Sequence, residues 1–258
     1  MFPILIIGNA HIQMYTLCMG IGFATGVIPL YFRGKTLGIK FIQLLACYAI
    51  AGCMAILGGK VASMLANLPS YIAMATELGY NFFDLYNSAG AIFYGNMLAA
   101  ILGVLLYCAL YKKSFWKFID AFLPLLPWVL AIWRIGCFCA GCCYGIPFEH
   151  GMYFTASSVA PHDVKLLPLQ LIESAGCFAI FVILMLKGRK PLPKYNMMGL
   201  FFVLYPALRL VLEFFRGDEK SATIGIFSIQ QWISVALVAV GILLLVYVKK
   251  KGPAAVEA

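Results

Sequence analysis

Charged side chains are scarce in this sequence. Asp, Glu, Lys and Arg make up 11% of the 258 residues, against roughly 25% in soluble globular domains. Apolar residues make up 63%, the mean hydropathy is +0.93, and there are only 3 histidines. A chain with so little charge cannot cover a water-facing surface. The composition therefore excludes an ordinary soluble domain and indicates an integral membrane protein.

The sequence also lacks linker-like stretches rich in Ser, Gly or Pro, and it shows no internal repeat. We therefore predict a single transmembrane domain over residues 1–258. No basic leader and no small-residue cleavage site precede the first apolar run. We expect no removable signal peptide, and the first span should remain in the protein.

Seven apolar runs are long enough, at roughly 20 residues each, to cross a hydrocarbon core of about 30 Å. They lie near residues 12–32, 39–57, 89–111, 116–139, 169–186, 197–215 and 230–248, and none of them contains a histidine. We predict an all-α polytopic membrane protein with seven transmembrane helices.

The basic residues fall mostly on one side of these spans. Thirteen of the 19 lie in alternate connections or after the last span: Arg33, Lys35, Lys40, Lys112, Lys113, Lys117, Lys187, Arg189, Lys190, Lys194 and Lys249, Lys250 and Lys251. By the positive-inside rule that side is cytoplasmic, so the N-terminus is expected outside and the C-terminus in the cytoplasm. The net charge of +9 then reflects topology and attraction to anionic lipid, and does not indicate a nucleic-acid partner. The outer loop 59–88 suits an interfacial arm.

Polar residues gather near the outer ends of spans four to six. They are Arg134, Gln170, Glu173, Tyr205, Arg209, Glu213 and Arg216. Arg209 and Glu213 are four residues apart and can pair on one helix face, which Tyr205 extends by a turn. Stapling of helices, or snorkelling to the interface, would explain any one of them. Together they favour a water-filled cavity. Since arginine binds phosphate bidentately, Arg134 and Arg209 at headgroup depth point to an anionic phospholipid.

Four of the nine cysteines fall within seven residues, at Cys137, Cys139, Cys142 and Cys143. Their spacing does not match the paired C-x-x-C zinc patterns and no histidine follows at ligand spacing, so we predict neither a metal site nor a cofactor. A reactive thiol, a disulfide near an oxidising surface and plain packing remain open. The other cysteines are isolated in apolar runs and are expected to pack in the core.

Seven stretches carry a resemblance to a known family. They are MFP at the start, YTLCMGIGF at 15–23, FYG at 93–95, RIGCFCAGCCYG at 134–145, LPLQLIE at 167–173, YPALRLVLEFFRGDE at 205–219 and FSIQQW at 227–232. In this order and spacing the chain resembles the prolipoprotein diacylglyceryl transferase family, and within it a cysteine-rich branch. The resemblance covers nearly the whole chain. It implies a seven-span enzyme of the bacterial cytoplasmic (inner) membrane.

The resemblance also implies a reaction. The family transfers the diacylglyceryl group of phosphatidylglycerol to the thiol of a lipobox cysteine in a prolipoprotein and releases glycerol 1-phosphate at the outer leaflet. By this likeness the phosphate lies on Arg134 and Arg209, with Glu213 as the acid of the R-x-x-x-E motif. Arginines there would stabilise the charge that grows on the departing phosphate. The residues expected to line the substrate are Tyr15, Gly95, Cys137, Gln170, Glu173, Tyr205 and Arg216.

The chain departs from the family at several positions where chemistry is expected. Tyr94 stands where F-H-G has its histidine, and Cys142 replaces the signature glutamate. Cys137 and Ala140 replace the signature asparagines, and Leu167 replaces the histidine of H-P-x-Q-L-Y-E. The predicted site is poor in bases, because tyrosine has an unperturbed pKa near 10.

Two further interpretations follow from these departures. Cys142 could be a nucleophile, forming a thiol-bound lipid intermediate or acting on a different acceptor, because a nearby Arg134 would favour its thiolate. Alternatively, a non-catalytic phospholipid-binding or lipid-moving protein could hold a headgroup with the same arginines. A receptor would share the topology but gives no reason for charges at one outer depth.

Overall fold

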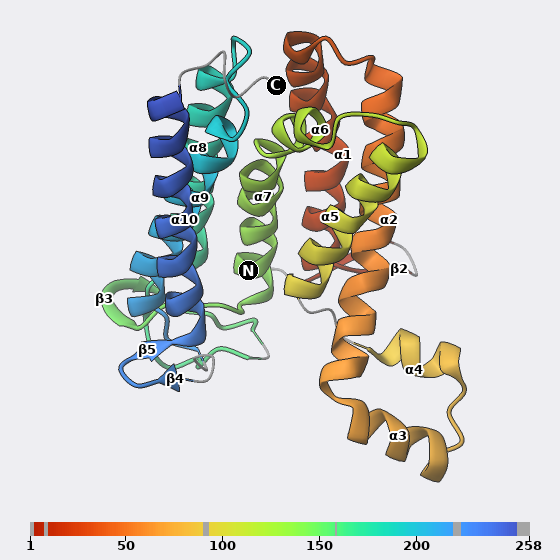
Figure 1. The fold of residues 1–258 in the computed structure, drawn as a ribbon. Coiled ribbons are helices and arrows are strands. Elements are labelled where there is room, and N and C mark those ends of the chain that lie inside the picture. Colours follow the sequence, from red (N-terminus) through yellow and green to blue (C-terminus); the bar gives the residue numbers. More distant parts are fainter. Residues whose placement is uncertain (1–2, 8–9, 90–92, 158, 219–222, 252–258) are drawn as a thin grey trace. The chain divides into compact units, whose positions relative to one another are not determined.

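The computed structural model of the protein describes residues 3–7, 10–89, 93–157, 159–218 and 223–251 and is mostly helical (Figure 1). Six helices are long and apolar enough to cross a membrane: Met14–Leu37, Phe41–Ala66, Phe115–Ala140, Leu169–Lys187, Asn196–Phe214 and Ile229–Lys251. The third expected span corresponds to a shorter apolar helix, Gly95–Leu110. The multi-pass helical class is confirmed, whereas the count of seven spans stays a prediction.

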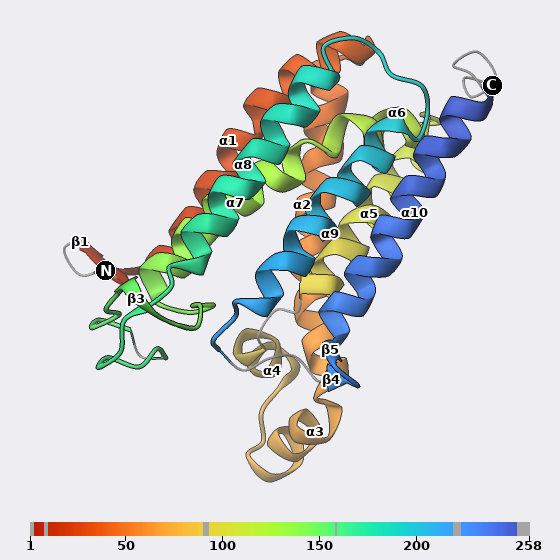
Figure 2. The ribbon, with the colours of Figure 1, turned by 90° about the vertical axis from the view of Figure 1, so that its left-hand side faces the viewer.

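The chain divides into two compact units, one made of Met1–Gly38 with Asp120–Ala258 and the other of Ile39–Ile119. In the first unit α1 (Met14–Leu37) packs on α7 (Leu125–Ala140), and α7 packs on α8 (Leu169–Lys187). From there α8 contacts α9 (Asn196–Phe214), which lies along α10 (Ile229–Lys251), as Figure 1 and Figure 2 both show. The single domain predicted from the sequence stays a prediction.

The fold is mostly helical, as expected, but it also contains short strands that the sequence did not predict. β1 (Ile4–Ile7) pairs antiparallel with β2 (Ala10–Gln13), and β4 (Thr223–Ile224) pairs with β5 (Phe227–Ser228). The first span was expected from residue 12, but Gln13 is extended, with φ −68° and ψ 124°, and the helix begins at Met14. A fifth strand, β3 (Pro147–Met152), follows α7.

The fourth expected span is formed by two consecutive helices, α6 (Phe115–Phe122) and α7. Pro124 lies at the break, and Pro127 falls in the first turn of α7. Proline has no N–H to donate, so it interrupts a continuous helix but is tolerated where a helix starts. After this break, α7 starts at Leu125 and runs to Ala140, where the cysteine-rich segment leaves the helix.

The approach of α1 to α7 is close because glycine lies at their contact. A Cβ added at Gly136 would lie 2.9 Å from Cys18 Cβ and 3.1 Å from Tyr15 Cα. Small residues at such crossings let helix backbones approach in a membrane. The Tyr15 ring packs edge-on against Trp133, with centroids 5.6 Å apart. The end of α7 that carries Arg134 is thereby fixed against the start of α1.

The other end of this unit holds a buried ion pair that the sequence did not predict. Arg33, 1% exposed, contacts Asp120 at 2.6 Å and donates to the Gly188 carbonyl. We expected Arg33 in the connection after the first span, but α1 continues to Leu37 and keeps it inside the helix. Asp120 was missed because the pair is separated by 87 residues.

In the second unit α2 (Phe41–Ala66) packs closely on α5 (Phe93–Leu110). A Cβ added at Gly95 would lie 2.9 Å from the Gly58 carbonyl oxygen and 3.2 Å from Gly59 Cα. The expected loop 59–88 is largely helical, because α2 runs on to Ala66 before α3 (Leu68–Glu77) and α4 (Phe82–Ser88). Its place at a membrane interface stays a prediction, which exposed Phe82 and Phe83 support.

Candidate functional site

Two arginines from different helices share one buried carboxylate. Arg134 Nε on α7 lies 3.0 Å from Glu173 Oε2 on α8, and Arg209 Nη1 on α9 lies 3.3 Å from the same oxygen. Glu173 is 3% exposed at its side chain. The prediction that Arg134 and Arg209 converge is confirmed, because both form an ion pair with Glu173. The surrounding water-filled cavity stays a prediction.

Arg209 holds a second carboxylate on its own helix. Its Nη2 lies 3.0 Å from Glu213 Oε2, which confirms the i, i+4 pair expected from the sequence. Glu213 Oε1 also accepts a hydrogen bond of 3.2 Å from Ser228 Oγ. From α10, Gln230 Oε1 accepts hydrogen bonds from Arg209 Nε at 3.2 Å and Nη2 at 2.7 Å. The guanidinium plane of Arg209 is thus held from three sides.

A third arginine links this network to the cysteines. Arg216 Nη1 lies 3.7 Å from Glu213 Oε2, and its Nε lies 2.6 Å from Asp218 Oδ1. The hydrogen bond to Asp218 raises the pKa of Arg216 further above its ordinary value, against the effect of burial. Its Nη2 lies 3.9 Å from Cys143 Sγ. Sequence reasoning missed Asp218 and Gln230 as partners, although both fall in the stretches that carry the family resemblance.

The network balances three arginines against three carboxylates and is mostly buried. The side chains of Arg134, Arg209 and Arg216 are 16%, 11% and 15% exposed. Burying charges is costly unless each finds a partner, so these groups hold one another. Buried Glu173 Oε1 has no hydrogen-bond partner among the described residues, and the same holds for nearby Gln170 Oε1. Such an oxygen is suited to accept a donor from a ligand.

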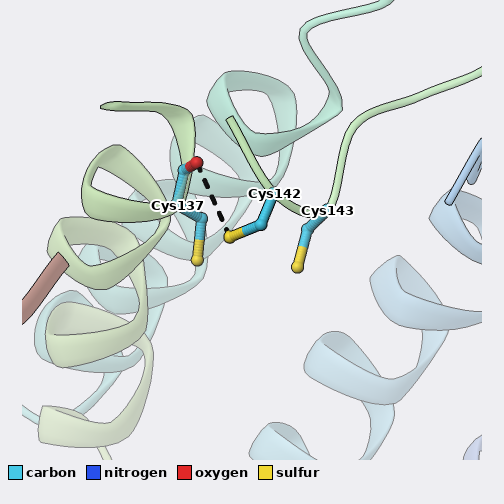
Figure 3. Close-up of side chains that lie close together, drawn as sticks. All are labelled: Cys137, Cys142 and Cys143. Carbon is cyan, nitrogen blue, oxygen red and sulfur yellow. Dashed lines mark hydrogen bonds between the residues drawn. The ribbon is translucent and has the colours of Figure 1, made fainter. Parts of the chain in front are cut away.

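The cysteine-rich segment begins with a chain reversal at the end of α7. Gly141 has φ 74°, its N–H donates to the Phe138 carbonyl at 3.2 Å, and the Cys142 N–H donates to the Cys137 carbonyl at 3.2 Å. These bonds form a Schellman motif, in which the side chains of the first and last of these residues meet. Here the two residues are Cys137 and Cys142, and Figure 3 shows their thiols together.

Cys143 adds a third thiol to this pair. It has φ 57°, a left-handed conformation that is uncommon outside glycine and asparagine. The Sγ atoms of Cys137, Cys142 and Cys143 all lie within 4.8 Å of one another (Figure 3). Gln170 Nε2 donates a 2.8 Å hydrogen bond to the Cys142 carbonyl and anchors the turn on α8.

The segment after the cysteines is tied to the end of α9. Gly145 and Arg216 form an antiparallel bridge, with hydrogen bonds of 3.0 Å from the Ile146 N–H to the Phe215 carbonyl and from the Gly217 N–H to the Tyr144 carbonyl. This pairing brings Arg216 beside Cys143. Residues separated by more than 70 positions therefore meet through backbone hydrogen bonds.

The thiols differ in acidity, in an order that the sequence did not predict. A hydrogen bond with Cys137 lowers the pKa of Cys142, but contact with Cys143 and burial together raise it to about 11. Hydrogen bonds with Cys137 and Cys142, together with the charges of Arg134 and Arg216, lower the pKa of Cys143. Arg134 lowers the pKa of Cys142, as expected, but burial and Cys143 outweigh it. The nucleophilic role of Cys142 stays a prediction.

The remaining expected site residues fall in different surroundings. Tyr205 stacks on Phe201, with ring centroids 5.6 Å apart, in a cluster with Trp133 and Leu208. Gly95 lies at the contact of α5 with α2 in the second unit. Tyr94 lies in the first turn of α5, and its side chain lies outside the described part of the structure.

Comparison with known proteins bears on this network. Residues 3–247 match the family described as prolipoprotein diacylglyceryl transferase. A phosphatidylglycerol–prolipoprotein diacylglyceryl transferase of Clostridium tetani is 30% identical over 233 residues, which cover 88% of this chain and 90% of the relative. A second such protein, from Clostridium perfringens, is 30% identical over 93% of both chains. One from Cupriavidus metallidurans is 29% identical over 82% of this chain and 77% of its own.

The family match spans the elements that carry the arginines, the shared carboxylate and the cysteine turn. The similar proteins also align with this chain over most of their own length. The chain belongs to the prolipoprotein diacylglyceryl transferase family.

Proposed function

We propose that this protein transfers the diacylglyceryl group of phosphatidylglycerol to the thiol of a lipobox cysteine in a prolipoprotein and releases glycerol 1-phosphate. Membership of the family and the names of its relatives support this activity. The observation that carries the proposal is the sharing of Glu173 Oε2 by Arg134 and Arg209. Two guanidinium groups that reach one carboxylate oxygen are also placed to hold one phosphate.

The network offers a place for each part of the lipid headgroup. Arg134 and Arg209 bind the phosphate and stabilise the charge that grows as it leaves. The unpaired Glu173 Oε1 accepts a hydrogen bond from a hydroxyl of the glycerol headgroup. Glu213 and Gln230 hold Arg209 in the required plane. These interactions position the reacting carbon for attack from the side opposite the phosphate.

In the reaction the acceptor sulfur attacks the terminal glycerol carbon of the diacylglyceryl group. An S–C bond forms and the C–O bond to the phosphate breaks, so that glycerol 1-phosphate leaves with the bonding electron pair. The acceptor thiol loses its proton before the attack, because the thiolate is the nucleophile. The roles of Tyr15, Tyr205 and Arg216 beside the substrate are part of this proposal. The roles of Tyr94 and Gly95 stay predictions from the family resemblance.

We further propose seven spans, with α5 as the third, the N-terminus outside, the C-terminus in the cytoplasm and the network near the outer leaflet. The last turns of α1, α8 and α10 carry Lys35, Lys187 and Lys249–Lys251. These ends lie together at one end of the first unit, at the top of Figure 1. The positive-inside rule assigns such an end to the cytoplasm.

Transfer is tested with purified protein, phosphatidylglycerol and a synthetic peptide that carries a lipobox cysteine. Mass spectrometry should show the peptide gaining one diacylglyceryl group while glycerol 1-phosphate appears in equal amount. A peptide with serine in place of that cysteine is the control. Retention of phosphatidylglycerol without transfer would instead support a lipid-binding protein, and a lipid adduct on Cys142 would support that thiol as a covalent intermediate.

A further inference from the structure

We propose that Cys137, Cys142 and Cys143 bind one Zn²⁺ ion through three thiolates, and that the open fourth position of the zinc takes the acceptor thiol. This inference rests on the proposed transfer for its last step, and on the cysteine geometry alone for the metal site. The ion is a new expectation, since the spacing of these cysteines in the sequence indicated no metal.

The three thiols already lie close to the geometry that zinc requires. Thiolates bind Zn²⁺ at about 2.3 Å, so two thiolates at corners of a tetrahedron are about 3.8 Å apart. The three Sγ atoms lie within 4.8 Å of one another. A contraction of about 1 Å at most, within reach of χ1 rotations, would complete three corners around one ion.

The backbone holds this arrangement without needing the metal. The Schellman turn fixes Cys142 against Cys137, and the hydrogen bond from Gln170 fixes the Cys142 carbonyl. Ser157 Oγ donates a 3.1 Å hydrogen bond to the Gly141 carbonyl from the other side of the turn. Preorganised thiols lose little conformational freedom when they bind an ion, which favours binding.

Three ligands leave a position open. Structural zinc sites have four protein ligands, whereas catalytic sites have three and keep the fourth position for water or substrate. Among the described residues, no other histidine, cysteine or carboxylate completes this group of three. Cys137 is 5% exposed, while Cys142 and Cys143 are only partly buried. The cluster therefore has one covered side and one side that a substrate can approach.

The charges around the cluster suit this ion and its substrate. Three thiolates and Zn²⁺ carry a net charge of −1, and a fourth thiolate makes it −2. Arg216 Nη2 lies 3.9 Å from Cys143 Sγ, and Arg134 is one helical turn before Cys137 on α7. Such outer cations offset the negative charge of a thiolate-rich site. Through Glu213 and Glu173 the same arginines connect the cluster to the proposed phosphate site.

Among the described residues, the network lacks a free base that could deprotonate the acceptor thiol, and a bound zinc ion would make such a base unnecessary. The carboxylates Glu173 and Glu213 are both ion-paired with arginines, and the three histidines lie outside the spanning helices. A metal-coordinated thiol is deprotonated, so its proton passes to solvent and the sulfur remains as a thiolate. That sulfur then forms the S–C bond while the C–O bond to phosphate breaks. Zinc has no redox role in this step.

The metal site is tested first, on the full-length protein in detergent, purified with a reductant. We expect one zinc per chain by elemental analysis, and a thiolate-to-metal charge-transfer band with a tetrahedral visible spectrum when Co²⁺ replaces it. Cys142→Ser and Cys143→Ser should each weaken Co²⁺ binding by at least about tenfold, since even indirect partners of metal ligands are worth 10–100-fold. Cys139→Ser is the matched control, because Cys139 lies in the same cysteine-rich segment but outside the group of three.

Three outcomes would overturn the metal site. They are wild-type protein that binds neither Zn²⁺ nor Co²⁺ in reduced form, a disulfide among these cysteines in protein purified without reductant, and copper bound in place of zinc. The Co²⁺ spectrum of the wild-type protein tests the metal site even if a cysteine variant fails to fold. An unchanged spectrum in Cys142→Ser would also contradict the site.

The role of the open position is tested with the acceptor peptide. The cysteine peptide should shift the spectrum of the Co²⁺ protein, and the serine peptide should leave it unchanged. Removal of zinc should abolish transfer, and adding zinc back should restore it. Transfer that survives in zinc-free protein would overturn this inference while leaving the proposed function intact. A spectral response to the peptide without transfer from phosphatidylglycerol would overturn the proposed function and leave the thiol-binding zinc site.

Discussion

At the scale of single residues, Glu173 joins the arginines of the site. It is the one carboxylate on α8 that meets arginines from both α7 and α9. Buried ion pairs rarely add much stability, but removing one partner is costly because it leaves a buried charge alone. Under the proposed function, Glu173 would hold Arg134 and Arg209 in place until the phosphate of the lipid binds them.

Arg209→Lys should lower the rate of transfer by about 10–100-fold, and Arg209→Ala by about 10²–10³-fold, the usual loss for one transition-state donor. Lysine keeps the charge but not the planar fork that engages Glu213, Gln230 and a phosphate together. Arg33→Lys is the matched control, because Arg33 is also buried and ion-paired but lies near the other end of the first unit. Full activity of Arg209→Lys would contradict a bidentate phosphate contact.

Glu173→Gln should lower the thermal stability of the protein in neutral detergent, with a loss of about 3–5 kcal/mol, because Arg134 and Arg209 lose a shared partner. Phosphatidylglycerol should then stabilise the variant more than it stabilises the wild type, since the lipid phosphate replaces the lost charge. Both effects are measured as shifts in melting temperature. Asp218→Asn is the control, because among the described residues Asp218 pairs with Arg216 and contacts neither Arg134 nor Arg209. Equal lipid shifts in wild type and Glu173→Gln would argue against a phosphate between the two arginines.

At the scale of elements, the turn at the end of α7 brings together cysteines whose spacing in the sequence does not predict a contact. Cysteines five residues apart do not share a helix face, so Cys137 and Cys142 give no helical or strand pattern. A glycine after a helix does predict a left-handed cap, and Gly141 could have indicated that these two side chains meet. The sequence could not predict that Cys143 approaches Cys137 and Cys142. This contact depends on a positive φ at a non-glycine residue and on backbone pairing with the end of α9.

Gly141→Ala should destabilise the protein by about 2–4 kcal/mol. A side chain at φ 74° is strained by roughly 1–2 kcal/mol, and its Cβ would also overlap the side chain of Ser157. Gly38→Ala is the matched control, because Gly38 has φ 66° with no atom within 4 Å of an added Cβ. The Gly38→Ala variant should lose only the stability that backbone strain costs. Equal melting temperatures for the two variants would contradict the tight contact with Ser157.

At the scale of the whole molecule, the membrane class followed from composition, and the ion pair of Arg209 with Glu213 followed from helical spacing. The contacts between different helices could not be predicted from composition or helical spacing. Glu173 and Gln230 lie 36 and 21 residues from Arg209, and a single sequence has no signal for which helix faces meet. Likewise, the helices α3 and α4 were expected as a loop, because their small and aromatic residues suit either structure.

The remaining question at this scale is whether α5 crosses the membrane. It has 18 residues, about 27 Å of helix, which is marginal for a hydrocarbon core of about 30 Å. If it crosses, Gly79, between α3 and α4, lies outside and Lys112, after α5, lies inside. Alkaline phosphatase, which is active only outside the cytoplasm, should be active when inserted at Gly79 and inactive at Lys112. A C-terminal fusion after α10 should also be inactive. Activity at both Gly79 and Lys112 would show that α5 does not span, and activity of the C-terminal fusion would contradict the proposed orientation.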